Sequence, residues 1–123
     1  MSEQDRLNAL RDRLRAFVRE RDWEQFHSPK NLSMALAIEA AELMEHFQWI
    51  STDASRAIAS HPDQLQAVSD ELADVLCYVL ALANELGVDL SASVRRKMAK
   101  NQKKYPADQY QGRYGPEDNP QRE

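Results

Sequence analysis

Residues 65–86 read L-Q-A-V-S-D-E-L-A-D-V-L-C-Y-V-L-A-L-A-N-E-L, and this stretch decides the fold. Its apolar residues recur at an alternating spacing of three and four positions (Leu65, Val68, Leu72, Val75, Val79, Leu82 and Leu86). This spacing places them on one face of an α-helix that packs against other helices at a shallow angle. Pro62 precedes the stretch and Gly87 follows it. We therefore expect a helix that begins near Pro62 and ends before Gly87, which suits the position just after a helix.

Shorter apolar patterns predict three further main helices and a short helical turn over residues 51–60. The expected main helices run from Ser2 to about Arg21, from about Lys30 to Trp49, and from about Leu90 to Tyr105. Ser28-Pro29 is a typical helix start, and Pro106 ends the last helix. The chain has only 3 Gly, which argues against a β-rich fold. The sequence predicts an all-α domain over residues 1–106, a bundle of about four main helices, followed by a polar tail over 107–123 that we expect to be flexible.

Composition narrows the classes of protein that need to be considered. The 123 residues suffice for one domain, and the amino terminus lacks signal-peptide character. No apolar run approaches the ~20 residues of a membrane span, so we expect a cytoplasmic protein with no membrane partner. The net charge of −4 argues weakly against a nucleic-acid binder. The single Cys77 can form neither an intramolecular disulfide nor a zinc site, and we expect it to be buried.

Four carboxylates form two pairs that point to a metal site. Glu39 and Glu42 lie three residues apart, as do Glu71 and Asp74, so each pair shares one helix face at the edge of an apolar stripe. Like charges at this spacing repel, and a cation would neutralise them. Oxygen ligands suit Mg²⁺, Mn²⁺ or Ca²⁺, whereas a di-iron site would need a histidine three residues after such a glutamate, and the residues three past Glu42 and Glu71 are Glu45 and Asp74. The alternative is that these acids lie on ordinary solvated faces, and spacing alone leaves both interpretations open.

A basic face and an aromatic cluster complement the acids. Lys97, Asn101 and Lys104 fall at i, i+4 and i+7 of the last helix, with Tyr105 beside them, and such a face can hold phosphate oxygens. A solvated basic helix is the alternative. Three aromatics with a nearby histidine could form a wall on which a base stacks (Trp23, Phe26 and Trp49, with His27). The alternative is that Trp23 and Phe26 fill the gap between the first two helices.

Four motifs together resemble a known family. They are E-R-D-W-E-Q-F-H-x-P-x-N-L over 20–32, E-x-x-E-L-x-E-x-F-Q-W over 39–49, E-L-A-D-V-L-x-Y over 71–78 and K-M-x-x-N-x-x-K-Y-P over 97–106. In combination they resemble the MazG-like all-α NTP pyrophosphatases, and most closely the dCTP pyrophosphatase branch. The resemblance covers roughly residues 10–106.

The resemblance implies an activity that spacing alone does not indicate. It implies hydrolysis of dCTP, or of a 5-modified deoxycytidine triphosphate, to the monophosphate and pyrophosphate, a house-cleaning reaction of the nucleotide pool. The implied cofactor is Mg²⁺, with Mn²⁺ as a possible substitute, and the implied assembly is a homotetramer built as a dimer of dimers. The implied catalytic and metal-binding residues are Glu39, Glu42, Glu71 and Asp74, of which Glu39 is our choice for orienting the attacking water. The implied substrate-binding residues are Trp23, His27, Trp49, Tyr78, Lys97, Asn101, Lys104 and Tyr105.

Two other classes of function remain open at the level of sequence. One is a non-catalytic helical interaction module, in which the acids bind no metal. The other is a helical bundle that binds nucleic acid through its basic helix, which the acidic total disfavours. Mg²⁺-dependent release of pyrophosphate from deoxynucleoside triphosphates, measured beside DNA binding, distinguishes the three.

Overall fold

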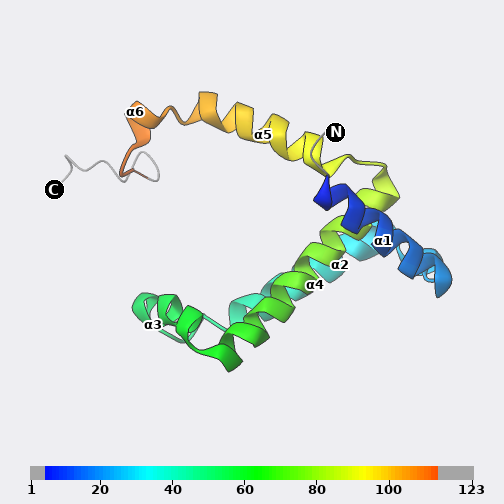
Figure 1. Cartoon of the computed structure of the whole chain (residues 1–123), viewed down its shortest axis with the longest axis horizontal. Coiled ribbons are helices and arrows are strands. Elements are labelled where there is room, and N and C mark those ends of the chain that lie inside the picture. The colour runs from blue at the N-terminus through cyan, green and yellow to red at the C-terminus, as the bar shows by residue number, and fades with distance from the viewer. Residues whose placement is uncertain (1–4, 114–123) are drawn as a thin grey trace. The chain divides into compact units, whose positions relative to one another are not determined.

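The computed structural model describes residues 5–113 and confirms the all-α prediction, since this range holds helices and turns and no strand. The chain divides into two compact units, residues 1–90 and 91–123. The first unit holds α1 (Arg6–Glu20), the 3₁₀ turn η1 (Glu24–Phe26), α2 (Pro29–Glu45), α3 (Thr52–Ala57), the 3₁₀ turn η2 (Ile58–Ser60) and α4 (Pro62–Leu86). α5 (Leu90–Lys104) begins at the last residue of the first unit, and α6 (Ala107–Tyr110) follows it (Figure 1).

The first unit is organised around the long helix α4. Both α1 and α2 pack against α4, and α2 lies beside it (Figure 1). The buried apolar residues come from α1, α2, η2 and α4, and Leu32 of α2 is only 2% exposed. They are Val18, Leu32, Ile58, Val68, Leu80, Ala81 and Ala83. This core fixes α2 against α4, the two helices that carry the four candidate metal ligands.

Helix bounds follow from local capping chemistry. The Ser28 side chain accepts a hydrogen bond from the backbone N–H of Asn31 at 3.1 Å, and Pro29 opens α2, as predicted. α4 begins at Pro62 and is closed by Gly87, whose φ of 67° is the left-handed conformation expected of that position. The short helical turn predicted over 51–60 is also confirmed, as α3 and η2.

Two predicted helix bounds are wrong. The first helix begins at Arg6 because the Asp5 side chain, rather than Ser2, caps it by accepting the N–H of Asn8. Ser2 itself lies outside the described residues. The second helix ends at Glu45 rather than Trp49, because the backbone tightens there into a 3.2 Å hydrogen bond from the His46 N–H to the Leu43 carbonyl.

Burial differs from the sequence prediction at several positions. Cys77 is exposed rather than buried, because α1 meets α4 further along, where Arg15 donates a hydrogen bond to Asn84 and where Leu80 and Ala81, one turn beyond Cys77, are buried. The apolar helix face predicted over residues 65–86 is only partly covered by other helices, and Leu65, Leu72 and Leu86 are exposed. Val94 and Met98, apolar residues of α5, are exposed as well. Within residues 5–113 no single helix has the length and apolar character of a membrane span; only α4 and α5 taken together reach it.

Candidate metal and nucleotide site

Three carboxylates meet between α2 and α4. Glu39 and Glu42 project from one face of α2, and Glu71 projects from α4, which packs beside it. One carboxylate oxygen from each of the three lies within 4.8 Å of the other two, and all three side chains are half-buried. The structure thus brings together three of the four acids that the sequence singled out.

The electrostatics of this cluster favour a cation. Oε2 of Glu39 and Oε2 of Glu71 are buried and have no hydrogen-bond partner. An ionised carboxylate accepts hydrogen bonds and cannot donate them. Two buried carboxylate oxygens that lie close together can therefore be stabilised only by a proton or a cation that they share. Accordingly, desolvation raises the pKa of Glu39 to about 7, aided by hydrogen bonding and charge from Glu42, the charge of Asp74, and hydrogen bonding to Glu71. The donor set fits a hard divalent metal ion.

Asp74 stands slightly apart from this cluster. It is exposed on α4, three residues beyond Glu71, and it is not one of the three acids whose oxygens converge. Its charge nevertheless contributes to the raised pKa of Glu39, so it belongs to the same electrostatic site. Asp74 also lines a groove on the neighbouring side of α4, and it therefore connects the carboxylate cluster to that groove.

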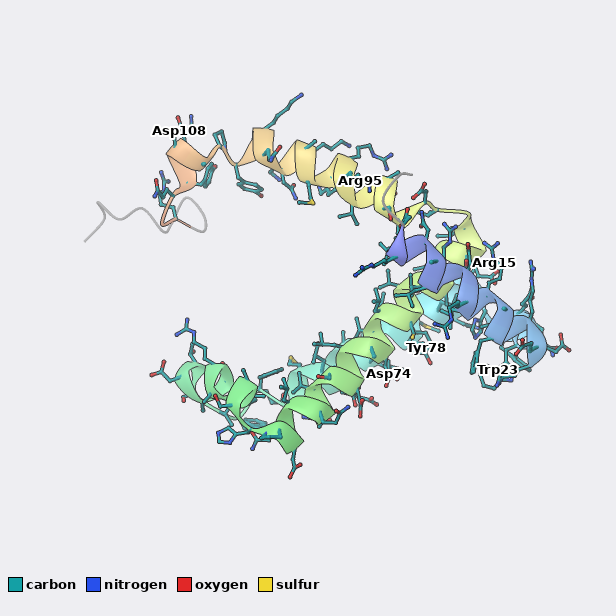
Figure 2. The ribbon with its side chains drawn as sticks, viewed as in Figure 1. Arg15, Trp23, Asp74, Tyr78, Arg95 and Asp108 are labelled. Atoms are coloured by element: carbon teal, nitrogen blue, oxygen red, sulfur yellow. The ribbon has the colours of Figure 1, made fainter. Side chains whose placement is uncertain are left out.

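The groove has a volume of about 740 Å³. It runs between α1 and α4 and reaches the connector that follows α1. Figure 2 shows Asp74 and Tyr78 on one stretch of α4 and Trp23 beyond the end of α1. Trp23 packs edge-to-face on Phe17, with ring centroids 5.7 Å apart. Four predicted site residues line this groove: Trp23, His27, Asp74 and Tyr78.

The remaining predicted residues lie elsewhere. Trp49 is 87% exposed in the turn after α2 and does not line the groove. In the second unit, Tyr105 packs edge-to-face on Tyr110, and the Lys104 ammonium lies 5.3 Å from the Tyr105 ring centroid. Lys97 and Asn101 are exposed on α5.

Some groove residues were missed at the level of sequence. Leu14, Phe17 and Arg13 of α1 line the groove. In the sequence, Leu14 and Phe17 are recognisable only as part of an apolar stripe, and Arg13 only as a solvated charge. Cys77, expected in the core, lines the groove beside Tyr78. No pattern in the sequence distinguishes a stripe that lines a groove from one that is covered, so these residues carried no usable signal.

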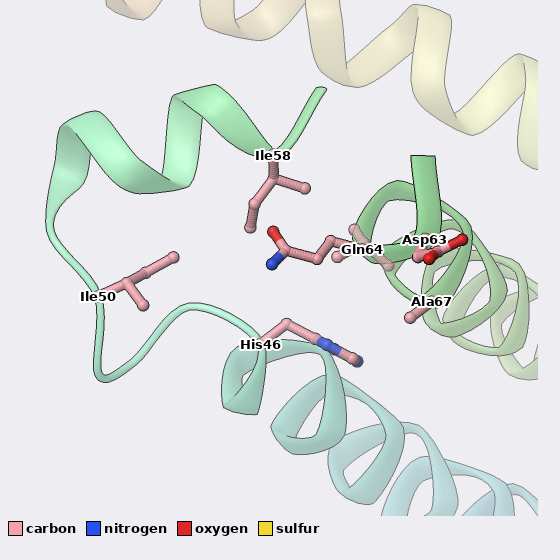
Figure 3. A pocket seen from close by; sticks show the side chains of 7 residues that line it. His46, Ile50, Ile58, Asp63, Gln64 and Ala67 are labelled. Carbon is pink, nitrogen blue, oxygen red and sulfur yellow. The ribbon is translucent and has the colours of Figure 1, made fainter. Parts of the chain in front are cut away.

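A separate cavity of about 370 Å³ lies at the other end of α4 (Figure 3). It is lined by His46, Ile50, Ile58, Asp63, Gln64, Ala67 and Val68, and includes none of the predicted site residues.

A sequence model of the MazG-like family matches residues 34–114, which include all three clustered carboxylates. The chain belongs to the MazG-like family. The resemblance drawn from the four motifs is therefore confirmed, and the match extends beyond the predicted domain end at residue 106.

Relatives of this MazG-like chain include dCTP pyrophosphatase 1 of Homo sapiens, 46% identical over 91 residues that make up 74% of this chain and 54% of that protein. The Bos taurus protein of the same name is 42% identical over 105 residues, 85% of this chain and 62% of the relative. The chain thus spans little more than half the length of these curated relatives. The crystal structure of a pyrophosphatase from Archaeoglobus fulgidus matches with a TM-score of 0.74 and 38% identity, over 86% of this chain and 97% of that one.

Proposed function

We propose that this MazG-like chain is a nucleoside triphosphate pyrophosphohydrolase that cleaves dCTP, or a 5-modified deoxycytidine triphosphate, to the monophosphate and pyrophosphate. The names of the relatives support this substrate class. The observation that carries the proposal is the carboxylate cluster, with its unpartnered buried oxygens, beside a groove lined by aromatic residues.

The proposed metal ion is Mg²⁺, with Mn²⁺ as a substitute. Glu39, Glu42 and Glu71, joined by Asp74 from the groove side, are the residues that would hold it. When bound, such an ion polarises phosphate oxygens and offsets their negative charge. Oxygen-only ligands on two packed helices suit the rigid geometry that Mg²⁺ prefers.

The chain's own residues would bind the nucleotide and move the proton. Trp23 and Tyr78 present aromatic rings to the groove on which a base can stack, and His27 offers a ring nitrogen to its edge. Glu39 would orient the attacking water and accept its proton, since its carboxylate lies in the cluster and is ionised when a cation is held there. The water oxygen bonds to phosphorus, and the bond between the α- and β-phosphoryl groups breaks.

Lys97, Asn101 and Lys104 share one face of α5 and would hold phosphate oxygens, with Tyr105 near the nucleoside.

We further infer a homo-oligomer, a dimer of dimers, because many large apolar side chains of the single chain are exposed. Trp49 would then be available to the site of a neighbouring copy. An exposed indole that does not line the groove beside Asp74 in its own chain is consistent with such a role.

Product analysis tests the proposed reaction. Phosphorus NMR after incubation with dCTP and Mg²⁺ should show dCMP and pyrophosphate in equal amounts. Orthophosphate with dCDP would instead identify a γ-phosphatase. A purine triphosphate cleaved as well as dCTP would leave the metal chemistry standing and remove the dCTP assignment.

Glu42→Gln tests the carboxylate cluster. We expect turnover to fall by roughly a hundredfold or more, because a charge at the reacting centre is lost. The metal-free variant should unfold at the same temperature as the wild type or higher, since a like charge leaves a crowded site. Glu45→Gln is the matched control, because Glu45 is exposed on the same helix and outside the cluster. A strongly destabilised metal-free Glu42→Gln would show instead that the carboxylate supports a buried partner.

A further inference from the structure

The connector after α1 contains a residue in an unusual backbone conformation. Asp22 has a φ of 53°, and it is the one non-glycine residue with positive φ among residues 5–113. A side chain with a Cβ atom is disfavoured in this left-handed region, although Asp and Asn tolerate it better than other residues. Such a conformation persists only where the surrounding structure holds it in place.

Backbone hydrogen bonds hold Asp22 in this conformation. The N–H of Asp22 donates to the Arg19 carbonyl at 3.0 Å, and the N–H of Trp23 donates to the Val18 carbonyl at 3.0 Å. These two bonds form the Schellman arrangement that closes many helices, with Asp22 in the position usually taken by glycine. The Gln25 side-chain amide also donates to the Asp22 carbonyl at 3.0 Å.

This turn determines where Trp23 lies. The chain reverses at Asp22, and the Trp23 ring meets the Phe17 ring of the preceding helix edge-to-face, with an interplanar angle of 76°. The Arg21 guanidinium lies 3.7 Å from the centroid of the Phe17 ring and also donates to the Phe17 carbonyl at 3.0 Å. Phe17 and Trp23 then both line the 740 Å³ groove. A different backbone path at residue 22 would send the indole elsewhere.

We propose that Asp22 is a positioning residue for substrate binding: its left-handed backbone conformation fixes Trp23 as the groove wall on which the base stacks. The proposal rests on the proposed function, because it needs the groove to receive the nucleotide. Asp22 itself does not line the groove and acts through Trp23.

A graded series at residue 22 tests the backbone role. Asp22→Gly keeps the conformation free of steric strain and should retain the wild-type KM for dCTP. Asp22→Ala should raise KM moderately, and Asp22→Val most, because a β-branched side chain is the least compatible with positive φ. The kcat should change little in all three. If Asp22→Val fails to fold, the milder Asp22→Ala still gives the comparison with Asp22→Gly.

A double-mutant cycle tests whether the effect passes through Trp23. Trp23→Ala alone should raise KM by roughly tenfold, the scale of one base-stacking contact. Adding Asp22→Val to Trp23→Ala should raise it no further, because the indole that Asp22 positions is already gone. A general loss of structure at the turn would instead make the two effects add.

A spectroscopic measurement gives an answer that does not depend on catalysis. In a Trp49→Phe background, tryptophan fluorescence reports on Trp23 alone, since the chain has only 2 Trp. Asp22→Val should shift this emission, whereas Asp22→Gly should leave it unchanged.

Several outcomes would overturn the proposal: an unchanged KM and emission in Asp22→Val, a raised KM in Asp22→Gly, or additive effects in the cycle. A wild type that does not cleave dCTP, or a Trp23→Ala variant with unchanged KM, would overturn the assignment to substrate binding. The emission of the residue-22 variants would then still decide whether Asp22 places Trp23, so the two failures are distinguishable.

Discussion

The Glu39 carboxyl shows how helix packing changes the chemistry of one residue. On an isolated helix its carboxyl would ionise near the ordinary value of 4.5. Packing α2 against α4 removes water from one of its oxygens and brings Glu71 close. Burial disfavours the ionised form, and the neighbouring carboxylates add to the effect, so the pKa rises to about 7.

The raised pKa of Glu39 predicts a pH dependence of stability. Between 4.5 and about 7 the folded metal-free protein holds a proton at this group that the unfolded chain releases. The free energy of unfolding should therefore fall as pH rises through this window, with the full contribution of Glu39 present below it. Thermal unfolding in the presence of EDTA, from about pH 5 to about pH 8, measures this dependence.

Glu39→Gln is the control for this prediction, because the amide does not titrate and the slope should flatten. Mg²⁺ added above pH 7 should offset the loss, since a bound cation stabilises the ionised cluster by mass action. A slope that is the same in wild type and Glu39→Gln would show that another group titrates.

At the residue scale, the sequence predicted which residues share a helix face better than it predicted what surrounds each side chain in the folded protein. The spacing of Glu39 and Glu42 is a property of one helix, and it correctly placed both on one face. Whether Asp74 joins Glu71 in the cluster, or Cys77 enters the core, depends on how α4 is rotated between α1 and α2. Local spacing contains no information on that rotation.

At the scale of elements, side-chain caps define where helices start. The Ser28 hydroxyl accepts a hydrogen bond from the N–H of Asn31 and fixes the start of α2 at Pro29, two residues after His27, which lines the groove. We expect Ser28→Ala to lower the free energy of unfolding by about 1 kcal/mol, the usual loss for such a cap. Urea denaturation measures this difference.

Ser33→Ala is the matched control for Ser28→Ala. The Ser33 hydroxyl donates to the Lys30 carbonyl at 2.8 Å within the same helix, where alanine has the higher helix propensity. We expect its stability to equal or exceed that of the wild type. Equal losses from both substitutions would mean that the Ser28 hydroxyl has no special capping role.

Helix bounds were predictable where one residue type fits the position best. Gly87 closes α4 because glycine alone adopts positive φ without strain, and the sequence offered it at the right place. α1 ends in the same arrangement with Asp22, and no glycine marked that turn. The start of α1 was missed because Ser2 and Asp5 are both good caps, and local chemistry does not rank them.

At the scale of the whole molecule, the described chain leaves more large apolar side chains exposed than it buries. Ile38 of α2 is 61% exposed and Leu72 of α4 is 53% exposed, although both belong to helices that form the core. Apolar periodicity identified these faces without showing whether the same chain or a second copy covers them. The fold class was therefore predictable from one chain, whereas the assembly remains a proposal.

Substitution of an exposed apolar residue tests that assembly. Light scattering of the wild type should give a mass several times the 14.1 kDa of one chain, four times for a dimer of dimers. Ile38→Glu or Leu72→Glu should shift the mass toward 14.1 kDa, because an ionised carboxylate is strongly disfavoured in an apolar interface. Gln102→Glu adds the same charge at an exposed polar position of α5 and should leave the mass unchanged.

A wild type that is already monodisperse at 14.1 kDa would contradict the oligomer. A wild-type oligomer that withstands both apolar substitutions would place the interface on another surface, since neither α2 at Ile38 nor α4 at Leu72 could then lie within it.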